Sequence, residues 1–280
     1  MINRMVKIFI SILFLAGYTC YRLVYRCIRK TSPVNLVVLT YHSIRDDQRQ
    51  NFVRQMDVLK RSHLVFADTE DHLNTGGRHV AITFDDGFHN FVENALPELI
   101  ERSIPAMLFI PTGYLGKKPG WISNQKGVIV NESVMRPDQL QALPQDVVRI
   151  GSHSVTHRFL TLMDEAEVMQ ELIGSKLCLE NLLNRTITSL SLPYGAYDNA
   201  VLDLAKIAGY MRIFSSWPVL PSSNSDGFLL GRVPVSPDET ALEFRLKIMG
   251  GYQWLPMGIS LKRTIYGVLR IHNAAGYPSE

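Results

Sequence analysis

Two short polar motifs each follow a run of apolar and β-branched residues, and their residue types could bind a metal ion. The first contains Asp85 and Asp86, and the second contains His153 and His157. Adjacent carboxylates raise each other's pKa unless a cation or another partner relieves them. Two imidazoles and one carboxylate leave coordination positions open for water and substrate. We therefore predict a catalytic site for one divalent ion, although an ordinary Asp-Gly turn and two incidental histidines would give the same residues.

The second carboxylate distinguishes between two kinds of metal chemistry. The same ligand set serves non-haem iron oxygenases, so the ligands alone do not indicate hydrolysis. A carboxylate beside a metal-activated water can take its proton during attack, as hydrolysis requires. We expect one helical turn after the strand to bring His153 and His157 to the same side. The turn Pro193-Tyr194-Gly195 could present the Tyr194 backbone N–H to an oxyanion, although Pro-x-Gly turns are common without that role.

The elements that would position these residues alternate between strands and helices. Apolar residues at helical spacing separate the candidate strands, which indicates parallel β/α units and favours a barrel over an open sheet. In a barrel the active site forms at the carboxyl ends of the strands, which is where both polar motifs lie. The predicted helices are 52–59, 95–103, 166–183 and 199–208. The predicted strands are 34–40, 80–84, 106–110, 148–152, 189–193, 211–215 and 229–235.

Charge and cysteine content exclude several classes of protein. The chain has 29 Lys and Arg against 26 Asp and Glu, but six of the basic residues and no acidic residue lie in residues 1–30. The remaining residues therefore lack the excess positive charge of a nucleic-acid-binding protein, and we expect no nucleic acid as a partner. Three cysteines are too few for a dense disulfide framework or a four-thiolate zinc site. The sequence gives no signal for an oligomeric state.

We expect three parts: an anchor or uncleaved signal over residues 1–30, the barrel over 31–237, and a helix followed by an apolar, basic tail over 238–280. The apolar run Ile8–Tyr21 lies between basic residues. An uncleaved membrane anchor fits this pattern best, and a basic amphipathic helix lying on a membrane surface is the alternative. We expect a membrane-anchored protein with an extracytoplasmic catalytic domain, although the basic residues after the run would favour the cytoplasmic face.

Three motifs resemble those of the polysaccharide deacetylase family, the NodB-homology domain of carbohydrate esterase family four. They occur in the order Thr83-Phe84-Asp85-Asp86-Gly87, His153-Ser154-Val155-Thr156-His157 and Leu192-Pro193-Tyr194-Gly195, and the resemblance extends from Leu36 to Pro237. It implies an α/β fold, a distorted (β/α)7 barrel behind the N-terminal hydrophobic helix. It also implies a hydrolase that removes acetyl groups from an acetylated amino-sugar polysaccharide, using one divalent ion such as Zn2+.

The resemblance also implies a role for each site residue. Asp85 would be the general base, and Tyr194 would donate its backbone N–H to the oxyanion. The metal ligands would be Asp86, His153 and His157. The candidate substrate-binding residues are Pro193, Trp217, Arg232 and His42.

The sequence departs from the family pattern at three places. The third motif usually begins with an Arg that helps to set the base, whereas Ser191 stands here, as in a branch near the biofilm poly-N-acetylglucosamine deacetylases. Arg232 is the candidate replacement for that Arg. The fourth motif keeps Trp217 without its Asp, and His272 is a weak candidate for the general acid of the fifth. Two alternatives therefore stay open: a polysaccharide-binding domain that retains the metal site, and a metal amidase acting on a non-sugar amide.

Overall fold

The structure, a computed structural model, describes residues 4–29, 35–67, 78–122, 132–218 and 227–256. The helices are α1 (Arg4–Arg29), α2 (Arg49–Arg61), α3 (Leu96–Arg102), α4 (Pro137–Gln141), α5 (Glu165–Leu183), α6 (Asn199–Ile207) and α7 (Ala241–Ile248). The strands are β1 (Asn35–Tyr41), β2 (Val65–Phe66), β3 (Arg78–Phe84), β4 (Ala106–Ile110), β5 (Val148–Ser152), β6 (Ser189–Ser191), β7 (Arg212–Phe214), β8 (Leu229–Leu230) and β9 (Arg232–Pro234).

The strands form one parallel sheet that closes on itself through a split strand. Its order is β8-β7-β6-β5-β4-β3-β1-β9, and the short strand β2 pairs with β3 outside this order. β8 pairs with β7 and β9 pairs with β1, yet only Gly231 separates β8 from β9. These two segments therefore act as the seventh strand of a barrel. The seven predicted strands and the α/β fold are confirmed.

The strands are buried on both faces, which explains their nearly continuous apolar sequences. Outside the barrel, aromatic side chains fill the space between the sheet and the helices, as where Tyr41 stacks on Phe84 at 5.3 Å between ring centroids. Inside the barrel lies a smaller apolar cluster that includes Phe109 and Phe214, whose centroids are 5.0 Å apart. The guanidinium of Arg232 lies 5.6 Å from the Phe109 ring centre. The charged end of Arg232 thus lies in the barrel interior.

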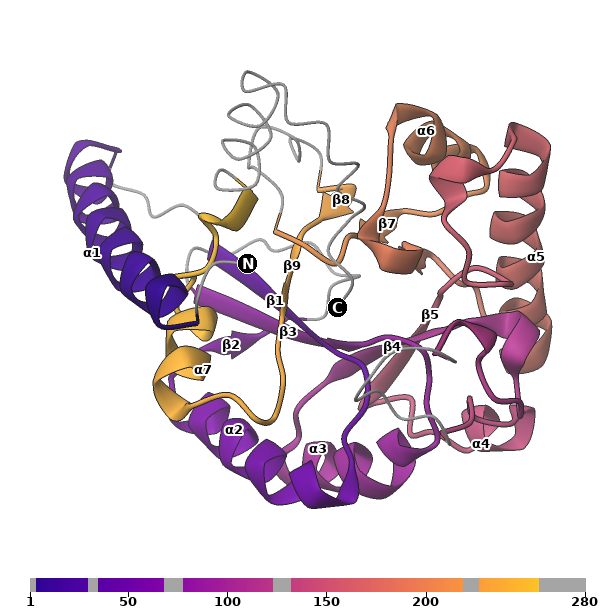
Figure 1. Cartoon of the computed structure of the whole chain (residues 1–280), viewed down its shortest axis with the longest axis horizontal. Coiled ribbons are helices and arrows are strands. Elements are labelled where there is room, and N and C mark those ends of the chain that lie inside the picture. Colours follow the sequence, from indigo (N-terminus) through magenta and orange to yellow (C-terminus); the bar gives the residue numbers. More distant parts are fainter. Residues whose placement is uncertain (1–3, 30–34, 68–77, 123–131, 219–226, 257–280) are drawn as a thin grey trace.

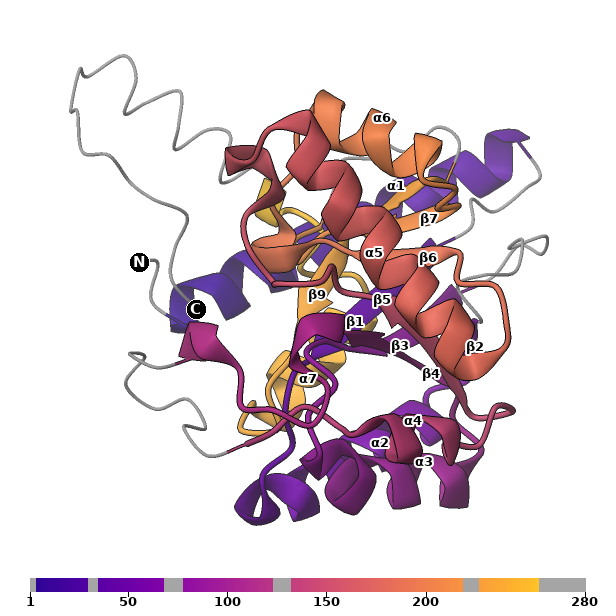
Figure 2. The same ribbon diagram turned by 90° about the vertical axis from the view of Figure 1, so that its right-hand side faces the viewer.

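Helices surround the sheet, as Figure 1 and Figure 2 show, with α2, α3 and α4 on one side and α5 and α6 on the other. Asp164 caps the start of α5, and its carboxylate accepts from the backbone N–H of Glu167. Asn184, in the left-handed conformation, caps the end of α5. α3 follows a π-helical turn over Phe91–Ala95. The four predicted helices correspond to α2, α3, α5 and α6. α7 lies in the part where a C-terminal helix was expected, and residues 257–280, which include His272, lie outside the described residues.

Candidate metal centre and active site

The carboxylates of Asp85 and Asp86, at the end of β3, point in different directions. The backbone N–H of Asp85 donates to Tyr41 O at 2.9 Å and so continues the strand pairing. Asp86 then takes a φ of +69° and Gly87 a φ of +57°. A side chain at Gly87 would also place its Cβ 2.4 Å from Ile110 Cδ1. The turn therefore needs glycine at this position, and it separates the Asp86 carboxylate from that of its neighbour.

The segment after β5 brings His153 and His157 together without a helical turn. Their ring centroids are 4.7 Å apart. Ser154 and His157 have φ values of +63° and +55°, which a right-handed helix does not allow. The predicted helical turn is therefore wrong, although the two imidazoles do lie on one side. A tight irregular turn replaces it.

Glu171 of α5 holds this turn in place. Its Oε2 accepts from the backbone N–H groups of Val155 and Thr156, both at 2.8 Å, and its Oε1 accepts from the Thr156 hydroxyl at 2.6 Å. A carboxylate that accepts three hydrogen bonds from one segment restrains it strongly. Glu171 was not among the predicted site residues, and its only signal in the sequence is a charged residue within the buried stripe of α5.

The long loop after β4 connects the two polar motifs that contain Asp86 and the histidines. At its start, the N–H groups of Thr112 and Gly113 donate to the carbonyls of Ser154 and Val155. At its end, the N–H of Met135 donates to Gly87 O at 2.9 Å. Residues 123–131 lie outside the described part of the chain. The described ends of the loop fix the two motifs relative to each other.

Asp86, His153 and His157 form a buried cluster with the chemistry of a metal site. One ligand atom from each residue lies within 4.8 Å of the others. Asp86 Oδ1 is 3.4 Å from His157 Nε2 and 3.7 Å from His153 Nε2. Burial lowers the pKa of both histidines below the usual value, and the neighbouring His153 lowers the pKa of His157 further. Both imidazoles are therefore neutral, which is the state in which histidine binds a metal.

The hydrogen bonding of His153 shows that this cluster suits a cation. Its Nδ1 lies 2.8 Å from Ser191 O, and because a carbonyl can only accept, Nδ1 carries the proton. The Nε2 of neutral His153 therefore presents a lone pair toward the Asp86 carboxylate. Two electron-rich atoms that face each other in a buried site favour a shared positive ion. The residues present fit one divalent ion.

Asp85 has a different partner from Asp86. Its two oxygens accept from Arg232 Nη1 and Nη2, each at 2.7 Å, and both side chains are fully buried. Burial alone would raise the pKa of Asp85, but Arg232 outweighs burial through its charge and its hydrogen bonds and holds this pKa well below its usual range. Asp85 is therefore ionised at any ordinary pH.

The guanidinium of Arg232 is satisfied on all sides. Beyond Asp85, its Nη1 donates to the Thr83 hydroxyl, its Nη2 to the Ser191 hydroxyl at 2.8 Å, and its Nε to Ser215 O at 2.9 Å. These contacts use all five N–H groups of an arginine. Arg232 was expected both among the substrate-binding residues and as the replacement for the missing Arg of the third motif. Its contacts with Asp85 agree with the second prediction, and its burial and saturated donors leave it no contact with a polymer in solvent. The structure places it as the partner of Asp85.

Ser191 and Arg232 together explain the absent Arg of the third motif. Ser191 is fully buried in β6, and its hydroxyl accepts from Arg232. A small side chain here leaves space for a guanidinium that comes from β9, on the opposite edge of the strand order. The guanidinium thus reaches Asp85 from another strand.

Aromatic rings surround the His157 side of the cluster. Trp121 stacks on His157 with ring centroids 4.1 Å apart, and Tyr194 meets the same ring edge-on at 4.8 Å. Phe159 stacks on Tyr194 at 4.0 Å. Tyr194 has a φ of +57°, an uncommon backbone conformation for a residue with a side chain. Phe159 was not among the predicted site residues, and its only signal in the sequence is its position a few residues after the His motif.

The other predicted site residues lie at different distances from this centre. His42 is the residue directly after β1. It interacts electrostatically with Asp85, His153 and His157, so it lies near all three. Pro193 is buried beside Tyr194. The backbone carbonyl of Trp217 accepts hydrogen bonds from the Ser215 hydroxyl and from the backbone N–H of Arg232. His272 lies outside the described residues.

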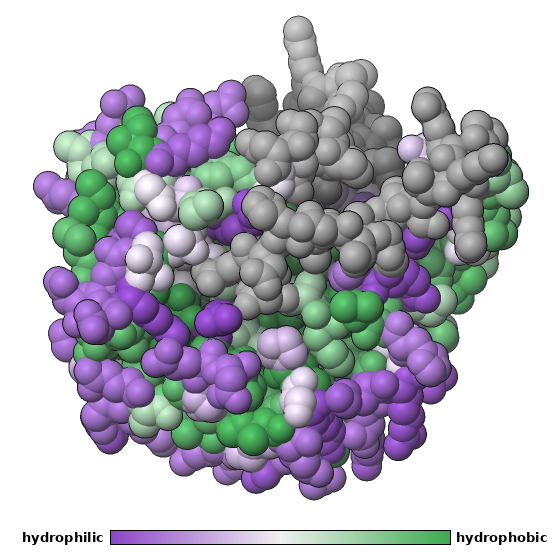
Figure 3. All heavy atoms as spheres, turned by 180° about the vertical axis from the view of Figure 1, so that it is seen from behind, coloured by the Kyte–Doolittle hydropathy of each residue, from purple (hydrophilic) through white to green (hydrophobic). Residues whose placement is uncertain are grey.

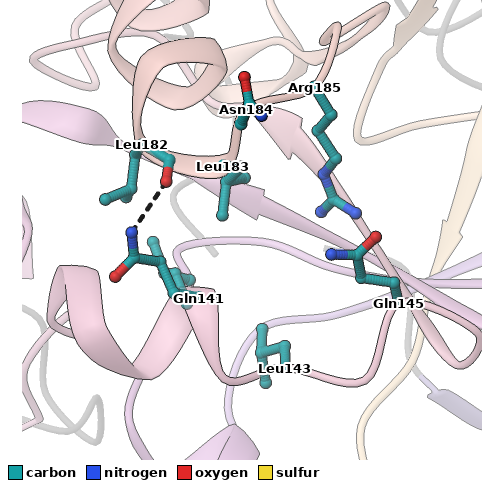
Figure 4. A pocket seen from close by; sticks show the side chains of 8 residues that line it. Gln141, Leu143, Gln145, Leu182, Leu183, Asn184 and Arg185 are labelled. Carbon is teal, nitrogen blue, oxygen red and sulfur yellow. Dashed lines mark hydrogen bonds between the residues drawn. The ribbon is translucent and has the colours of Figure 1, made fainter.

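A separate pocket lies between α4 and the end of α5, and Figure 4 shows the side chains that line it. Its volume is about 240 Å³, and Gln141 donates to Leu182 O across it at 3.0 Å. Leucines and amides line it together with Arg185. None of its residues belongs to the metal cluster or to the Asp85 ion pair, so this pocket is not the reacting centre.

Comparison with known proteins identifies the family. The family model for polysaccharide deacetylase matches residues 72–213, which is just over half of the chain. The chain belongs to the polysaccharide deacetylase family. This match confirms the predicted family, and with it the prediction that the protein is a hydrolase of this type.

Individual relatives agree with this assignment. The Bacillus subtilis (strain 168) protein YxkH, itself named after this family, is 25% identical over 232 residues, covering 78% of this chain and 77% of the relative. The poly-β-1,6-N-acetyl-D-glucosamine N-deacetylase of Staphylococcus aureus (strain MSSA476) is 24% identical over 243 residues, covering 81% of this chain and 82% of the relative. The structure of IcaB from Ammonifex degensii superposes with a TM-score of 0.63 at 22% identity, covering 79% of this chain and 99% of that chain. That likeness supports the barrel fold.

Proposed function

We propose that this protein is a metal-dependent deacetylase that removes N-acetyl groups from an amino-sugar polysaccharide. One observation supports this most strongly: two adjacent carboxylates of β3 have separate partners. Asp86 faces two neutral imidazoles, and Asp85 is held ionised by Arg232. Hydrolysis of an amide needs both a cation site and a base beside it.

Asp86, His153 and His157 would hold the ion. Two nitrogen ligands and one oxygen ligand, with open positions left for water and substrate, suit Zn2+. When bound, the ion would lower the pKa of a water molecule and polarise the acetyl carbonyl. His153 is oriented for this role by its hydrogen bond to Ser191 O, and the His157 ring by its stacking on Trp121.

Asp85 would take the proton from the attacking water. Its carboxylate is ionised, and the two hydrogen bonds from Arg232 fix its orientation. Arg232 acts here as a positioning residue. The backbone N–H of Tyr194 would donate to the oxyanion as the carbonyl carbon becomes tetrahedral. The leaving amine would take its proton from His272, which stays a prediction from the sequence.

The substrate class is inferred from the relatives and from the aromatic surroundings of the site. The S. aureus relative is named for poly-β-1,6-N-acetyl-D-glucosamine. Tyr194, Phe159 and Trp121 place aromatic rings around His157, and such rings suit the apolar faces of sugars. We place the catalytic domain outside the cytoplasm, where such polymers occur, with residues 1–30 at the membrane.

The test is acetate release by the full-length, metal-loaded protein from N-acetylglucosamine oligomers of β-1,6 and β-1,4 linkage. The Asp85→Asn variant removes the base, and Asp203→Asn on the exposed side of α6 is the matched control. We expect the wild type and the control to release acetate and Asp85→Asn to be slower by about 10²- to 10⁴-fold. Equal rates for all three proteins, or acetate release from non-sugar amides alone, would contradict the proposal.

A further inference from the structure

The N-terminal helix α1 has an exposed apolar stripe along its whole length. Its members recur at helical spacing and include no charged residue. Met5 is 70% exposed, Phe9 is 62% exposed and Leu23 is 59% exposed, although water-exposed side chains of this size are unfavourable. The stripe comprises Met5, Val6, Phe9, Ile12, Leu13, Ala16, Cys20, Leu23, Val24 and Cys27.

The opposite face of α1 is attached to the barrel. Ile8 and Ser11 are buried against the segment that contains α7, and the Ser11 hydroxyl accepts from Trp254 Nε1 at 2.9 Å. Arg4 forms an ion pair with Glu243 of α7, with 2.6 Å between Nε and Oε2. Figure 1 shows the first half of α1 beside α7 and the second half extending away from the barrel. The stripe and the attached face lie on different sides of the helix.

A helix attached in this way cannot also cross a bilayer. Its 22-residue segment Arg4–Tyr25 is apolar enough for a span, with a mean hydropathy of 1.6. Spanning would draw Arg4 and Ser11 away from Glu243 and Trp254, or would bring the charge of Glu243 into the hydrocarbon. If the contacts as far as Leu15 persist, residues 16–29 reach only about 21 Å, against the roughly 30 Å of a bilayer core. Attachment to the barrel and spanning are therefore alternatives.

We propose that α1 stays on the barrel and lies flat on an anionic lipid surface, with the stripe inserted among the acyl chains. Charge favours this occupant, because α1 contains Lys7, Arg22, Arg26 and Arg29 in addition to the paired Arg4, and no acidic residue. Anionic headgroups attract such a helix. A second copy of the chain would place two basic helices together, and their like charges would repel.

The surface of the molecule agrees with this arrangement. Seen from behind, the edge of the molecule on the side of α1 shows hydrophobic side chains next to charged ones (Figure 3). α1 leads into β1 through residues 30–34, a link too short to reach beyond roughly 20 Å. The second half of α1 therefore lies near the amino end of β1, whereas the metal centre lies at the carboxyl ends of the strands. The lipid surface would thus contact the side of the barrel and its amino end and leave the active site open to a polymer.

The test is binding of the full-length protein to vesicles, measured by flotation. The vesicles contain phosphatidylcholine alone or equal parts of phosphatidylcholine and phosphatidylglycerol. The stripe variant is Phe9→Glu with Leu13→Glu. The matched control is Leu162→Glu with Ile207→Glu, two apolar residues of the barrel that are 82% and 71% exposed. Thermal unfolding of each variant shows whether its barrel is intact.

A chemical bridge separates the flat arrangement from the spanning one. Ser11→Cys and Trp254→Cys are combined in a chain whose Cys20, Cys27 and Cys178 are replaced by Ser, and a short bismaleimide joins the two new thiols. We expect the bridged chain to bind anionic vesicles as well as the unbridged one. We also expect the stripe variant to bind at least about tenfold more weakly and the control to bind normally.

Three results would overturn the proposal. Loss of binding on bridging would show that α1 must leave the barrel, as a spanning helix would. Unchanged binding of the stripe variant would exclude the stripe as the contact. A stripe-dependent dimer in the absence of vesicles, measured by analytical ultracentrifugation, would identify a second copy as the occupant. None of these results depends on acetate release, so this proposal and the proposed deacetylase activity are tested independently.

Discussion

Asp85 and Asp86 are neighbours in the sequence, but their surroundings differ in almost every respect. Asp85 accepts two hydrogen bonds from Arg232 inside the barrel, so a fixed protein cation neutralises it. Asp86 faces two imidazoles whose pKa values are lowered by burial, and these carry no charge. One carboxylate thus has a permanent cation within the protein, and the other lies in the proposed metal site, where it would share a bound ion.

This difference shows how one turn can divide two identical side chains between two roles. The positive φ values of Asp86 and Gly87 direct the second carboxylate toward the histidines. The first stays in line with β3, where β9 brings Arg232 beside it. Arg232 relieves the repulsion on the Asp85 side, and an ion at the proposed site would relieve it on the Asp86 side.

Removing an imidazole gives the largest expected effect, because it removes one of the ligands that share the proposed metal site with Asp86. We expect His153→Ala to lose the bound ion and to slow acetate release by at least about 10³-fold. Metal content by mass spectrometry and acetate release measure the two effects. His63→Ala, far along the chain from both motifs, is the control. A His153→Ala protein that keeps one ion per chain would show that the ligand set is wrong.

Changing Arg232 removes the ion pair with Asp85. Arg232→Met leaves a buried carboxylate without its cation, which should lower the free energy of unfolding by about 3–5 kcal/mol. We expect acetate release to slow by about 10²-fold with the metal retained, because the base is no longer held ionised. Arg232→Lys keeps the charge without the paired hydrogen bonds. Its stability and its rate of acetate release should lie between those of the wild type and Arg232→Met. Urea unfolding and initial rates measure these changes, with Arg212→Met on β7 as the control.

If Arg232→Met unfolds at the same urea concentration as the wild type, the ion pair does not hold Asp85. If Arg232→Met releases acetate normally, Arg232 is not a positioning residue. Either result would remove the distinction between the two carboxylates.

Glu171→Gln tests whether a residue outside the site holds the two histidines in place. The substitution removes the negative charge that accepts from the Val155 and Thr156 N–H groups, and the turn with both histidines should loosen. Residues that orient metal ligands typically change metal affinity by about 10- to 100-fold, and we expect the lower end of that range. Competition with a chelator measures the affinity, and Glu165→Gln at the exposed start of α5 is the control. An unchanged affinity would limit Glu171 to a structural role.

Trp121→Leu should give the smallest effect. The variant removes the ring that stacks on His157 while keeping an apolar side chain, so metal affinity should fall only by about threefold. If the ring also contacts sugar, KM for oligomers should rise while kcat changes little. A normal KM would restrict Trp121 to its contact with His157.

Much of the barrel could be predicted because its strands are apolar runs of the right length that end in polar motifs. The partner of Asp85 could not be fixed, because Arg232 lies 147 residues away and reaches it only when β9 closes the barrel beside β1. The turn between the histidines was predicted as helical because spacing alone does not reveal a positive φ at serine and histidine. Glu171 was missed since apolar periodicity takes no account of a buried carboxylate.

The central claim is that Asp86 binds the ion and Asp85 does not. The most direct measurement is therefore the metal content of Asp85→Asn and Asp86→Asn, purified in parallel and dialysed against a limiting Zn2+ buffer. We expect Asp85→Asn to keep one ion per chain and Asp86→Asn to lose it, with both unable to release acetate at the wild-type rate. Equal metal content in the two variants, or loss of the ion from Asp85→Asn alone, would contradict the account.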